Sequence, residues 1–333
     1  MRGWLLQPSP GAAGRGTRLE WRQDLPEPHA GPGQVRIRVS ACGVCRTDLH
    51  EVDGELPLSH PVVPGHQVVG RIDEVGPGVT GFRPGERVGV PWLWSSCGRC
   101  AYCRQGRENL CESPRFTGLD VDGGYAEWTV APEEALLPLP PAYDDAEAAP
   151  LLCAGLIGYR SLRLSGVEPG GRLGLFGFGA SAHLTLQVAR HMGIEVYVFS
   201  RGEAHRRLAL ELGAAWAGSA GEEPPHPLDG AITFAPAGAL LPAALSSLRR
   251  GATLAINAVH MDRLPEMPYQ LLYHERSLRS VANLTREDGR RFMAIAGAVR
   301  LEVRVEPFPL EGAAEALAAV RQSRLEGSAV LLA

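Results

Sequence analysis

The sequence predicts an α/β protein with two domains, one rich in β-strands and one built on a doubly wound parallel sheet. In the first half, strands such as Val35–Val39 alternate apolar and polar residues and are separated by Pro-Gly and Gly-Pro turns. From about Ala148, strands and helices alternate instead, which is typical of a parallel sheet covered on both faces. A length of 333 residues is enough for two cores of ordinary size.

The second half supplies the individual elements of this parallel sheet. Apolar runs ending near glycine or loop residues predict strands at Leu173–Gly177, Val196–Phe199, Ala231–Ala235 and Thr253–Ile256. Intervening segments with helical spacing predict helices at Ala180–Met192, Glu203–Leu212 and Leu240–Leu248. A helix at Leu310–Arg324 and a strand at Ala329–Leu332 are expected to close the chain. Three prolines at 138, 140 and 141 suggest a linker before the second domain.

Composition and charge narrow the function classes. The formal net charge is -4 and all cationic side chains are Arg, so no basic surplus points to nucleic acid. No apolar stretch has the length of a membrane span or a signal-peptide core, so we expect a cytoplasmic protein without a membrane partner. Four of the 7 cysteines lie in one short segment, which favours metal binding over disulfides.

The clustered cysteines predict a structural metal site. They follow the pattern C-x2-C-x2-C-x7-C and are Cys97, Cys100, Cys103 and Cys111. Four thiolates this close repel one another unless a cation neutralises them, and a tetrahedral zinc ion with four sulfurs leaves no position for substrate. An iron–sulfur cluster is the main alternative, but its usual run ends C-x3-C-P, whereas Cys111 precedes Glu112. We expect a zinc lobe at about residues 95–113.

Three other potential ligands are scattered along the chain: Cys45, His66 and Cys153. Each alone is weak evidence, because a lone His or a buried thiol is more often structural. The residues around them favour a metal site over a purely structural role. The segment Gly43–His50 places a thiol, a hydroxyl, a carboxylate and an imidazole within six residues, and Pro64-Gly65-His66 lies between two Val-rich stretches.

These segments together resemble the zinc alcohol dehydrogenases of the medium-chain dehydrogenase/reductase superfamily, in particular the shorter bacterial type. The resemblance covers nearly the whole chain, and its motifs are Ala41–His50, Val63–His66, Asp73–Val79, the cysteine cluster, Val121–Glu127 and Leu152–Gly155. It implies a GroES-like catalytic domain, residues 1–152 and 284–333, and a Rossmann domain, residues 153–283. It also implies a homo-oligomer, tetramer or dimer.

The resemblance assigns roles to particular residues. Cys45, His66 and Cys153 would hold a catalytic zinc, the second zinc of the chain, with a fourth position open to substrate. Asp48 would orient His66, since a ligating His commonly donates its other N–H to a carboxylate. Thr47 and His50 would relay the proton of the alcohol to water. Arg46 is expected to bind the cofactor pyrophosphate, and Trp92 to form a wall of the pocket that favours small alcohols.

The cofactor domain carries its own pattern, G-x-G-x-x-A, at Gly177, Gly179 and Ala182, between a predicted strand and a predicted helix. NAD enzymes place an acid at the end of the next strand, where this chain has Ser200 followed by Arg201, with Arg206 and Arg207 close behind. An acid would repel a 2′-phosphate, so we expect NADP(H), with NAD as the alternative; Arg206 and Arg207 could equally lie on a solvated helix face.

Two positions depart from the family pattern. Gln67 replaces the usual Glu after the His ligand, which leaves the metal site less negative and is expected to ease ionisation of the alcohol. Ser328 replaces an Arg that reaches the pyrophosphate. The expected reaction is hydride transfer between a small alcohol or aldehyde and the nicotinamide. A polyol, formaldehyde or aromatic-aldehyde enzyme, a zinc-lobed module without activity, and a nucleic-acid zinc ribbon are the alternatives.

Overall fold

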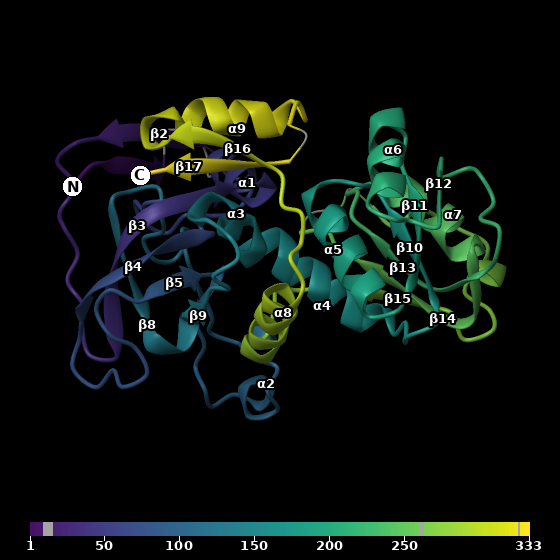
Figure 1. Ribbon diagram of the computed structural model, residues 1–333, viewed down its shortest axis with the longest axis horizontal. Helices are drawn as coiled ribbons and strands as arrows, with labels where there is room; N and C mark the ends of the chain where they lie inside the picture. Colours follow the sequence, from purple (N-terminus) through teal and green to yellow (C-terminus); the bar gives the residue numbers. More distant parts are fainter. Residues whose placement is uncertain (9–15, 260, 262, 326) are drawn as a thin grey trace. The chain divides into compact units, whose positions relative to one another are not determined.

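The computed structural model describes residues 1–8, 16–259, 261, 263–325 and 327–333, and it divides into two compact units (Figure 1). The first unit consists of Met1–Cys153, Thr285–Gly297 and Val303–Ala333, and the second of Ala154–Leu284 and Ala298–Glu302. Within the described ranges, no helix combines the length and the apolar character that a bilayer span requires.

A 7-stranded, mainly antiparallel sheet organises the first unit. Its order is β16 (Val305–Pro309), β17 (Ser328–Leu332), β3 (Gln34–Val44), β4 (Val68–Val75), β5 (Arg87–Val90) and β9 (Leu137–Pro138), with β8 (Trp128–Pro132) also paired to β3. The C-terminal strand β17 runs antiparallel to β3, while β16 and β17 are parallel. Helix α9 (Ala313–Arg321) lies over β16 and β17 (Figure 1).

The alternation that predicts the strand at Val35 explains how β3 packs. Val35 and Ile37 are 0% exposed, while Arg38 points to solvent. From Ala41 to Val44 the alternation stops and every residue is buried, because this end of β3 lies between β17 and β4 and leads directly into the site described below. An alternating strand thus becomes a fully buried one where it approaches the site.

Shorter elements complete the first unit. Two small antiparallel pairs join β1 (Gly3–Pro8) to β2 (Thr17–Arg22), and β6 (Leu93–Ser95) to β7 (Arg115–Phe116). The α-helices besides α9 are α1 (Arg46–Val52), α2 (Ala101–Arg104), α3 (Asp145–Pro150) and α8 (Arg286–Ala298), and short 3-10 turns occur at Glu108–Leu110, Glu133–Ala135 and Leu310–Gly312.

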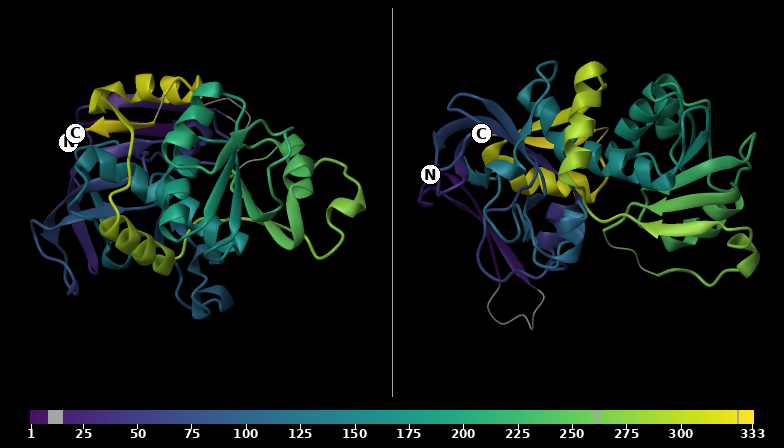
Figure 2. Two further views of the ribbon diagram at one scale, coloured as in Figure 1. Left: turned by 45° about the vertical axis from the view of Figure 1, so that its right-hand side comes forward. Right: turned by 90° about the horizontal axis from the view of Figure 1, so that it is seen from below.

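The second unit is a 6-stranded parallel sheet, and its strands lie side by side in Figure 2. The order is β12 (Trp216–Gly218), β11 (Glu195–Phe199), β10 (Arg172–Phe176), β13 (Leu228–Thr233), β14 (Leu248–Ile256) and β15 (Ser277–Ser280). The helices that pack on it are α4 (Leu156–Ser165), α5 (Ala180–His191), α6 (Glu203–Glu211) and α7 (Leu241–Ser246). Strand order reverses at β10, which makes this a doubly wound α/β fold, as predicted.

The chain passes from one unit to the other through a helical stretch rather than through the prolines. Pro138, Pro140 and Pro141 lie inside the first unit, so the expectation that they link the domains is wrong. Helix α3 is followed by a π-helical turn, Leu151–Gly155, and then by α4. Pro150, which has no N–H to donate, stands directly before this turn, and such local widening of a helix is frequent at functional sites.

Candidate active site

Three potential metal ligands from distant parts of the chain meet in the first unit. Cys45 Sγ lies 3.4 Å from His66 Nε2 and 4.0 Å from Cys153 Sγ. Cys45 precedes α1, His66 lies in the loop before β4, and Cys153 stands in the π-helical turn. The fold therefore gathers two sulfurs and one ring nitrogen that are separated by as many as 108 positions in sequence.

The spacing of these atoms fits a zinc ion. Zn–S bonds of about 2.3 Å and Zn–N bonds of about 2.0 Å place tetrahedral ligand atoms about 3.5–3.8 Å apart. The distances of 3.4 and 4.0 Å lie close to these values. The Cys153 thiol and burial raise the pKa of Cys45 well above its usual range, so this thiol resists ionisation unless a cation binds there. The ligand set is thus suited to zinc.

The capping of α1 positions two of the site residues. Asp48 accepts a hydrogen bond from the backbone N–H of Cys45 at 2.6 Å, while the Cys45 sulfur accepts one from Thr47 N at 3.4 Å. Asp48 Oδ1 also lies 3.2 Å from His66 Nδ1, and both side chains are 0% exposed. Burial by itself would lower the pKa of His66, but Asp48 and Cys45 raise it well above its usual range.

A buried acid that the sequence analysis missed lies beside this pair. Glu51 is 0% exposed, and its two carboxylate oxygens have no hydrogen-bond partner among the described residues. Ligand atoms of Asp48, Glu51 and His66 all lie within 4.8 Å of one another. The available signal was its position three residues after Asp48, on the same face of α1. Gln67, at the departure from the family pattern, is only 2% exposed.

The predicted relay and pyrophosphate residues lie on α1 as well. Thr47 is half-buried at the first turn of the helix, next to Cys45. His50 lies in the last turn, with its side chain 24% exposed, and its Nδ1 contacts the carboxylate of Glu55. Arg46 is exposed, and its Nη2 donates a 3.1 Å hydrogen bond to the hydroxyl of Ser323. Neither Glu55 nor Ser323 was singled out from the sequence.

Trp92 lies against the candidate ligand His66. The two rings meet edge to face at 4.9 Å, with an interplanar angle of 81°. The ring of Phe116 also stacks on the indole, at 5.0 Å between ring centroids. Two ring contacts fix the orientation of Trp92, so a bulky, rigid side chain borders the metal ligands.

The four clustered cysteines form a second group in the first unit. Their sulfur atoms all lie within 4.8 Å of one another, and Cys97 and Cys103 are 4.0 Å apart. Backbone N–H groups point at these sulfurs, including Cys97 N to Cys111 Sγ at 3.2 Å and Cys100 N to Cys97 Sγ at 3.4 Å. A closed shell of four sulfurs fits tetrahedral zinc and leaves no ligand position for substrate.

The thiols of this lobe differ in acidity. Backbone hydrogen bonds from Cys103 and Glu112 lower the pKa of Cys100 to about 6. Burial and the thiols of Cys100 and Cys111 raise the pKa of Cys103 to about 12. One thiol thus ionises readily while its neighbour is held back by the negative charge beside it, and a bound cation would relieve that repulsion.

Comparison with known proteins places the chain in a family. The model of the alcohol dehydrogenase GroES-like domain matches residues 31–141, and that of the zinc-binding dehydrogenases matches residues 182–297. The probable alcohol dehydrogenase AdhA of Mycobacterium tuberculosis (strain CDC 1551 / Oshkosh) is 48% identical over 340 residues, covering 100% of this chain and 97% of the relative. The chain belongs to the zinc-type medium-chain dehydrogenase/reductase family.

Other members of this dehydrogenase family match over similar lengths. An alcohol dehydrogenase of Geobacillus stearothermophilus is 33% identical over 323 residues, covering 93% of this chain and 95% of the relative. The crystal structure of an NAD-dependent alcohol dehydrogenase matches with a TM-score of 0.89 and 26% identity, covering 100% of both chains. The predicted combination of a GroES-like domain and a Rossmann domain is thereby confirmed.

The glycine pattern of this dehydrogenase lies at the carboxyl end of β10, in the second unit. Gly177 has a φ of +93°, which only glycine adopts without strain, and its N–H donates to the carbonyl of Phe199 at 2.8 Å. Gly179 is the N-cap of α5, and among the described residues beyond its own local backbone none lies within 4 Å of where its Cβ would be. Ala182 is 0% exposed. The helix therefore begins at an open backbone surface that a phosphate can approach.

The end of β11 in the dehydrogenase shows which basic groups are available there. Ser200 is 7% exposed, and its hydroxyl lies 3.4 Å from Nδ1 of His205, a residue not singled out from the sequence. The guanidinium of Arg206 is bonded to the backbone: its Nη1 donates to the carbonyls of Ser200 and Arg201 at 2.8 and 2.9 Å. Arg207 faces Glu203 on an exposed part of α6, while Arg201 is exposed at the strand end.

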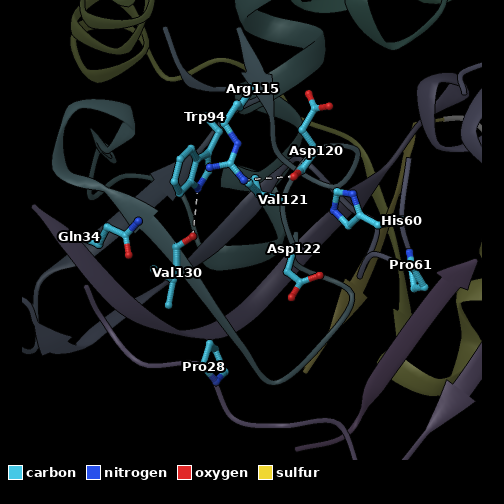
Figure 3. Close-up of a pocket in the computed structure, with 10 residues that line it drawn as sticks. All are labelled: Pro28, Gln34, His60, Pro61, Trp94, Arg115, Asp120, Val121, Asp122 and Val130. Carbon is cyan, nitrogen blue, oxygen red and sulfur yellow. Dashed lines mark hydrogen bonds between the residues drawn. The ribbon is translucent and has the colours of Figure 1, made fainter. Parts of the chain in front are cut away.

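A separate pocket of about 370 Å³ lies elsewhere in the first unit of the dehydrogenase (Figure 3). The guanidinium of Arg115 lies over the Trp94 ring at 4.9 Å and donates to the carbonyl of Asp120 at 3.4 Å. Trp94 itself is only 8% exposed and donates to the carbonyl of Val130 at 3.1 Å. Trp94 is therefore a core residue, unlike Trp92, and none of the candidate metal ligands lines this pocket.

Proposed function

We propose that this protein is a zinc-dependent alcohol dehydrogenase and aldehyde reductase that acts on small alcohols or aldehydes with NADP(H). The observation that carries the proposal is the group of Cys45, His66 and Cys153, two sulfurs and one nitrogen at distances suited to zinc. The proposal extends to two zinc ions per chain, a cytoplasmic homo-oligomer, tetramer or dimer, and no nucleic-acid or membrane partner.

Several residues of the first unit have distinct roles in the proposed reaction. When bound, zinc polarises the oxygen of the alcohol or aldehyde, and the nicotinamide takes up or gives the hydride. Cys45, His66 and Cys153 would hold the zinc. Asp48 would fix the ring of His66 by accepting from Nδ1, which keeps Nε2 directed at the metal.

Alcohol oxidation also releases a proton, and α1 carries the groups that would handle it. Thr47 lies two residues after Cys45, at the start of α1. Its hydroxyl would accept the proton of the alcohol and give its own proton to the next group of the relay. His50 would take up the proton at its ring and pass it to solvent, since its side chain is 24% exposed. Trp92 would restrict the space beside the metal ligands and so favour small substrates.

The second unit supports a choice of NADP(H). Gly177, Gly179 and Ala182 would bring the pyrophosphate to the start of α5, and Arg46 would supply a positive charge to it. Ser200 stands where an NAD enzyme carries an acid, so nothing at that position would repel a 2′-phosphate. Ser200, Arg201 and the neighbouring His205 would bind it.

Steady-state kinetics test both parts of the proposal. We expect turnover of short primary alcohols and aldehydes, with kcat/KM higher for NADPH than for NADH. Ser200→Asp should reverse this preference, because the new carboxylate repels the phosphate; Arg207→Ala, which alters an exposed cation paired with Glu203, is the control and should not. If NADH matches or exceeds NADPH in the native enzyme, the cofactor assignment is wrong.

A panel of substrates separates the proposal from its relatives. A polyol, formaldehyde or aromatic aldehyde turned over far better than short primary alcohols and aldehydes would redefine the substrate class while leaving the metal chemistry in place. Absence of turnover with every substrate and both cofactors, in protein that holds zinc, would indicate a module without catalytic activity.

A further inference from the structure

The chain folds back over the end of α1 at the turn that follows His50. The carbonyl oxygen of His50 accepts two backbone hydrogen bonds, from Glu55 N at 2.9 Å and from Leu56 N at 3.2 Å. Gly54 makes the reversal possible, since its φ is +72°. The backbone of Glu55 is therefore bonded to that of His50, independently of the Glu55 side chain.

The side chain of Glu55 makes a second contact with the same residue. Its Oε2 bonds to Nδ1 of His50, as a hydrogen bond and an ion pair. The turn is also anchored from α9, because Arg321 donates to both oxygens of Asp53 at 2.6 and 2.8 Å. Backbone, side chain and a neighbouring ion pair thus hold the Glu55 carboxylate against the ring.

This contact decides how the His50 ring carries its protons. A carboxylate only accepts hydrogen bonds, so Nδ1 must carry the proton and the lone pair of the neutral ring lies on Nε2. The tautomer matters because the proposed task of His50 is to take up one proton at its ring and release it.

We propose that Glu55 is a positioning residue of the proton relay, which fixes the tautomer of His50 so that Nε2 accepts the proton during alcohol oxidation. This inference rests on the proposed role of His50. It assigns a function to a surface carboxylate that does not contact the candidate metal ligands in the described structure. Glu55 acts through the imidazole, and its half-exposed oxygens keep the pair in contact with solvent.

Three arginines near α1 have partners other than His50. Arg321 on α9 is bound by Asp53, and Arg46 donates to Ser323. Arg18 on β2, which packs against α1, is paired with Glu20. Glu51 is buried on the side of α1 that faces His66 and Asp48. Among the described residues, Glu55 is a carboxylate whose contact with the His50 ring the structure shows.

The kinetics of alcohol oxidation in Glu55→Gln test the inference. Glutamine keeps the shape of the side chain, but its amide can donate as well as accept, so it no longer requires the proton on Nδ1 of His50. We expect kcat to fall several-fold while KM for the alcohol stays close to native, because the substrate does not contact Glu55. Glu223→Gln makes the same change at an exposed site outside this turn and should keep the native kcat. A native kcat in Glu55→Gln would overturn the proposal.

Two further measurements separate this inference from the proposed function. If His50→Gln keeps the native kcat, the relay itself is wrong, whatever Glu55→Gln does. If His50→Gln lowers kcat while Glu55→Gln matches the native enzyme, only the role of Glu55 is wrong. NMR of the histidine rings in native zinc-loaded protein, assigned with His50→Gln, needs no activity: we expect the proton of neutral His50 on Nδ1, and a proton on Nε2 would contradict the proposal.

Discussion

The ring of His66 and the carboxylate of Asp48 meet in a space closed to solvent: Nδ1 lies 3.2 Å from Oδ1, and both side chains are 0% exposed. Asp48 also caps α1 through Cys45 N. The carboxylate of Asp48 thus contacts the ring of one candidate ligand, His66, and the backbone of another, Cys45. Asp48 therefore supports two of the three candidate ligands without itself belonging to that ligand set.

Asp48→Asn should weaken zinc binding while leaving the fold in place. The amide keeps the size of the side chain but loses the charge that favours donation from His66 Nδ1, so we expect a loss of about 10- to 100-fold in zinc affinity. Competition with a chelator measures this directly. Asp53→Asn, in an exposed ion pair, is the matched control. Native affinity in Asp48→Asn would show that the carboxylate does not support the ligand.

Glu51→Gln should stabilise the protein at neutral pH. Burial and Asp48 raise the pKa of Glu51 well above its usual range. The unfolded chain therefore releases this proton more readily, and stability falls as the pH rises above the ordinary value of 4.5. We expect a higher Tm than native near pH 7 and no difference near pH 4, with exposed Glu223→Gln as the control. Equal melting curves near pH 7 would mean that the buried carboxyl group of Glu51 does not lower the stability of the protein at that pH.

Trp92→Ala should widen the range of substrates. The indole lies edge to face against His66, so its removal opens space beside the metal ligands. We expect kcat/KM for branched or aromatic alcohols to rise about tenfold relative to ethanol. Trp94→Phe, a change in the core, should leave that ratio as it is. A ratio unchanged in Trp92→Ala would remove Trp92 from the pocket wall.

Gly123→Ala should destabilise the loop that carries His66. An added Cβ would lie 1.9 Å from the carbonyl oxygen of Gly65, which is backbone and cannot turn aside. We expect a loss of about 2–3 kcal/mol in the free energy of unfolding, measured with urea. Gly221→Ala, where no atom lies within 4 Å, should stay close to native. Similar losses in both variants would mean that crowding at Gly65 is not the cause.

The parts of the site that could be predicted from sequence are those that local pattern determines. The spacing of Cys97, Cys100, Cys103 and Cys111 confines four sulfurs to one short loop, so their meeting needs no knowledge of the fold. The alternation around Val35 and the glycines at 177 and 179 likewise act over a few residues. Cys153 was different, because only the family motif linked it to Cys45.

The missed residues act through side-chain directions that spacing does not encode. The position of Glu51 on α1 does not by itself show that the side chain is buried, or that burial and Asp48 raise its pKa. The position of His205 in the sequence does not show that it lies beside the hydroxyl of Ser200. The sequence left open whether Arg206 would lie near the cofactor or on a solvated helix face, and its guanidinium in fact donates to two backbone carbonyls. Prolines at 138, 140 and 141 suggested a boundary, but the chain passes from the first unit to the second between Cys153 and Ala154, within a π-helical turn.

The zinc content of native protein and of Cys153→Ala tests the central claim most directly. We predict two zinc ions per chain in the native protein and one in the variant, because the cysteine lobe keeps its four sulfurs while the catalytic group loses one of three ligands. Cys42→Ala, a buried thiol outside both groups, should keep two. Two tightly bound ions in Cys153→Ala, or one in the native protein, would contradict the account.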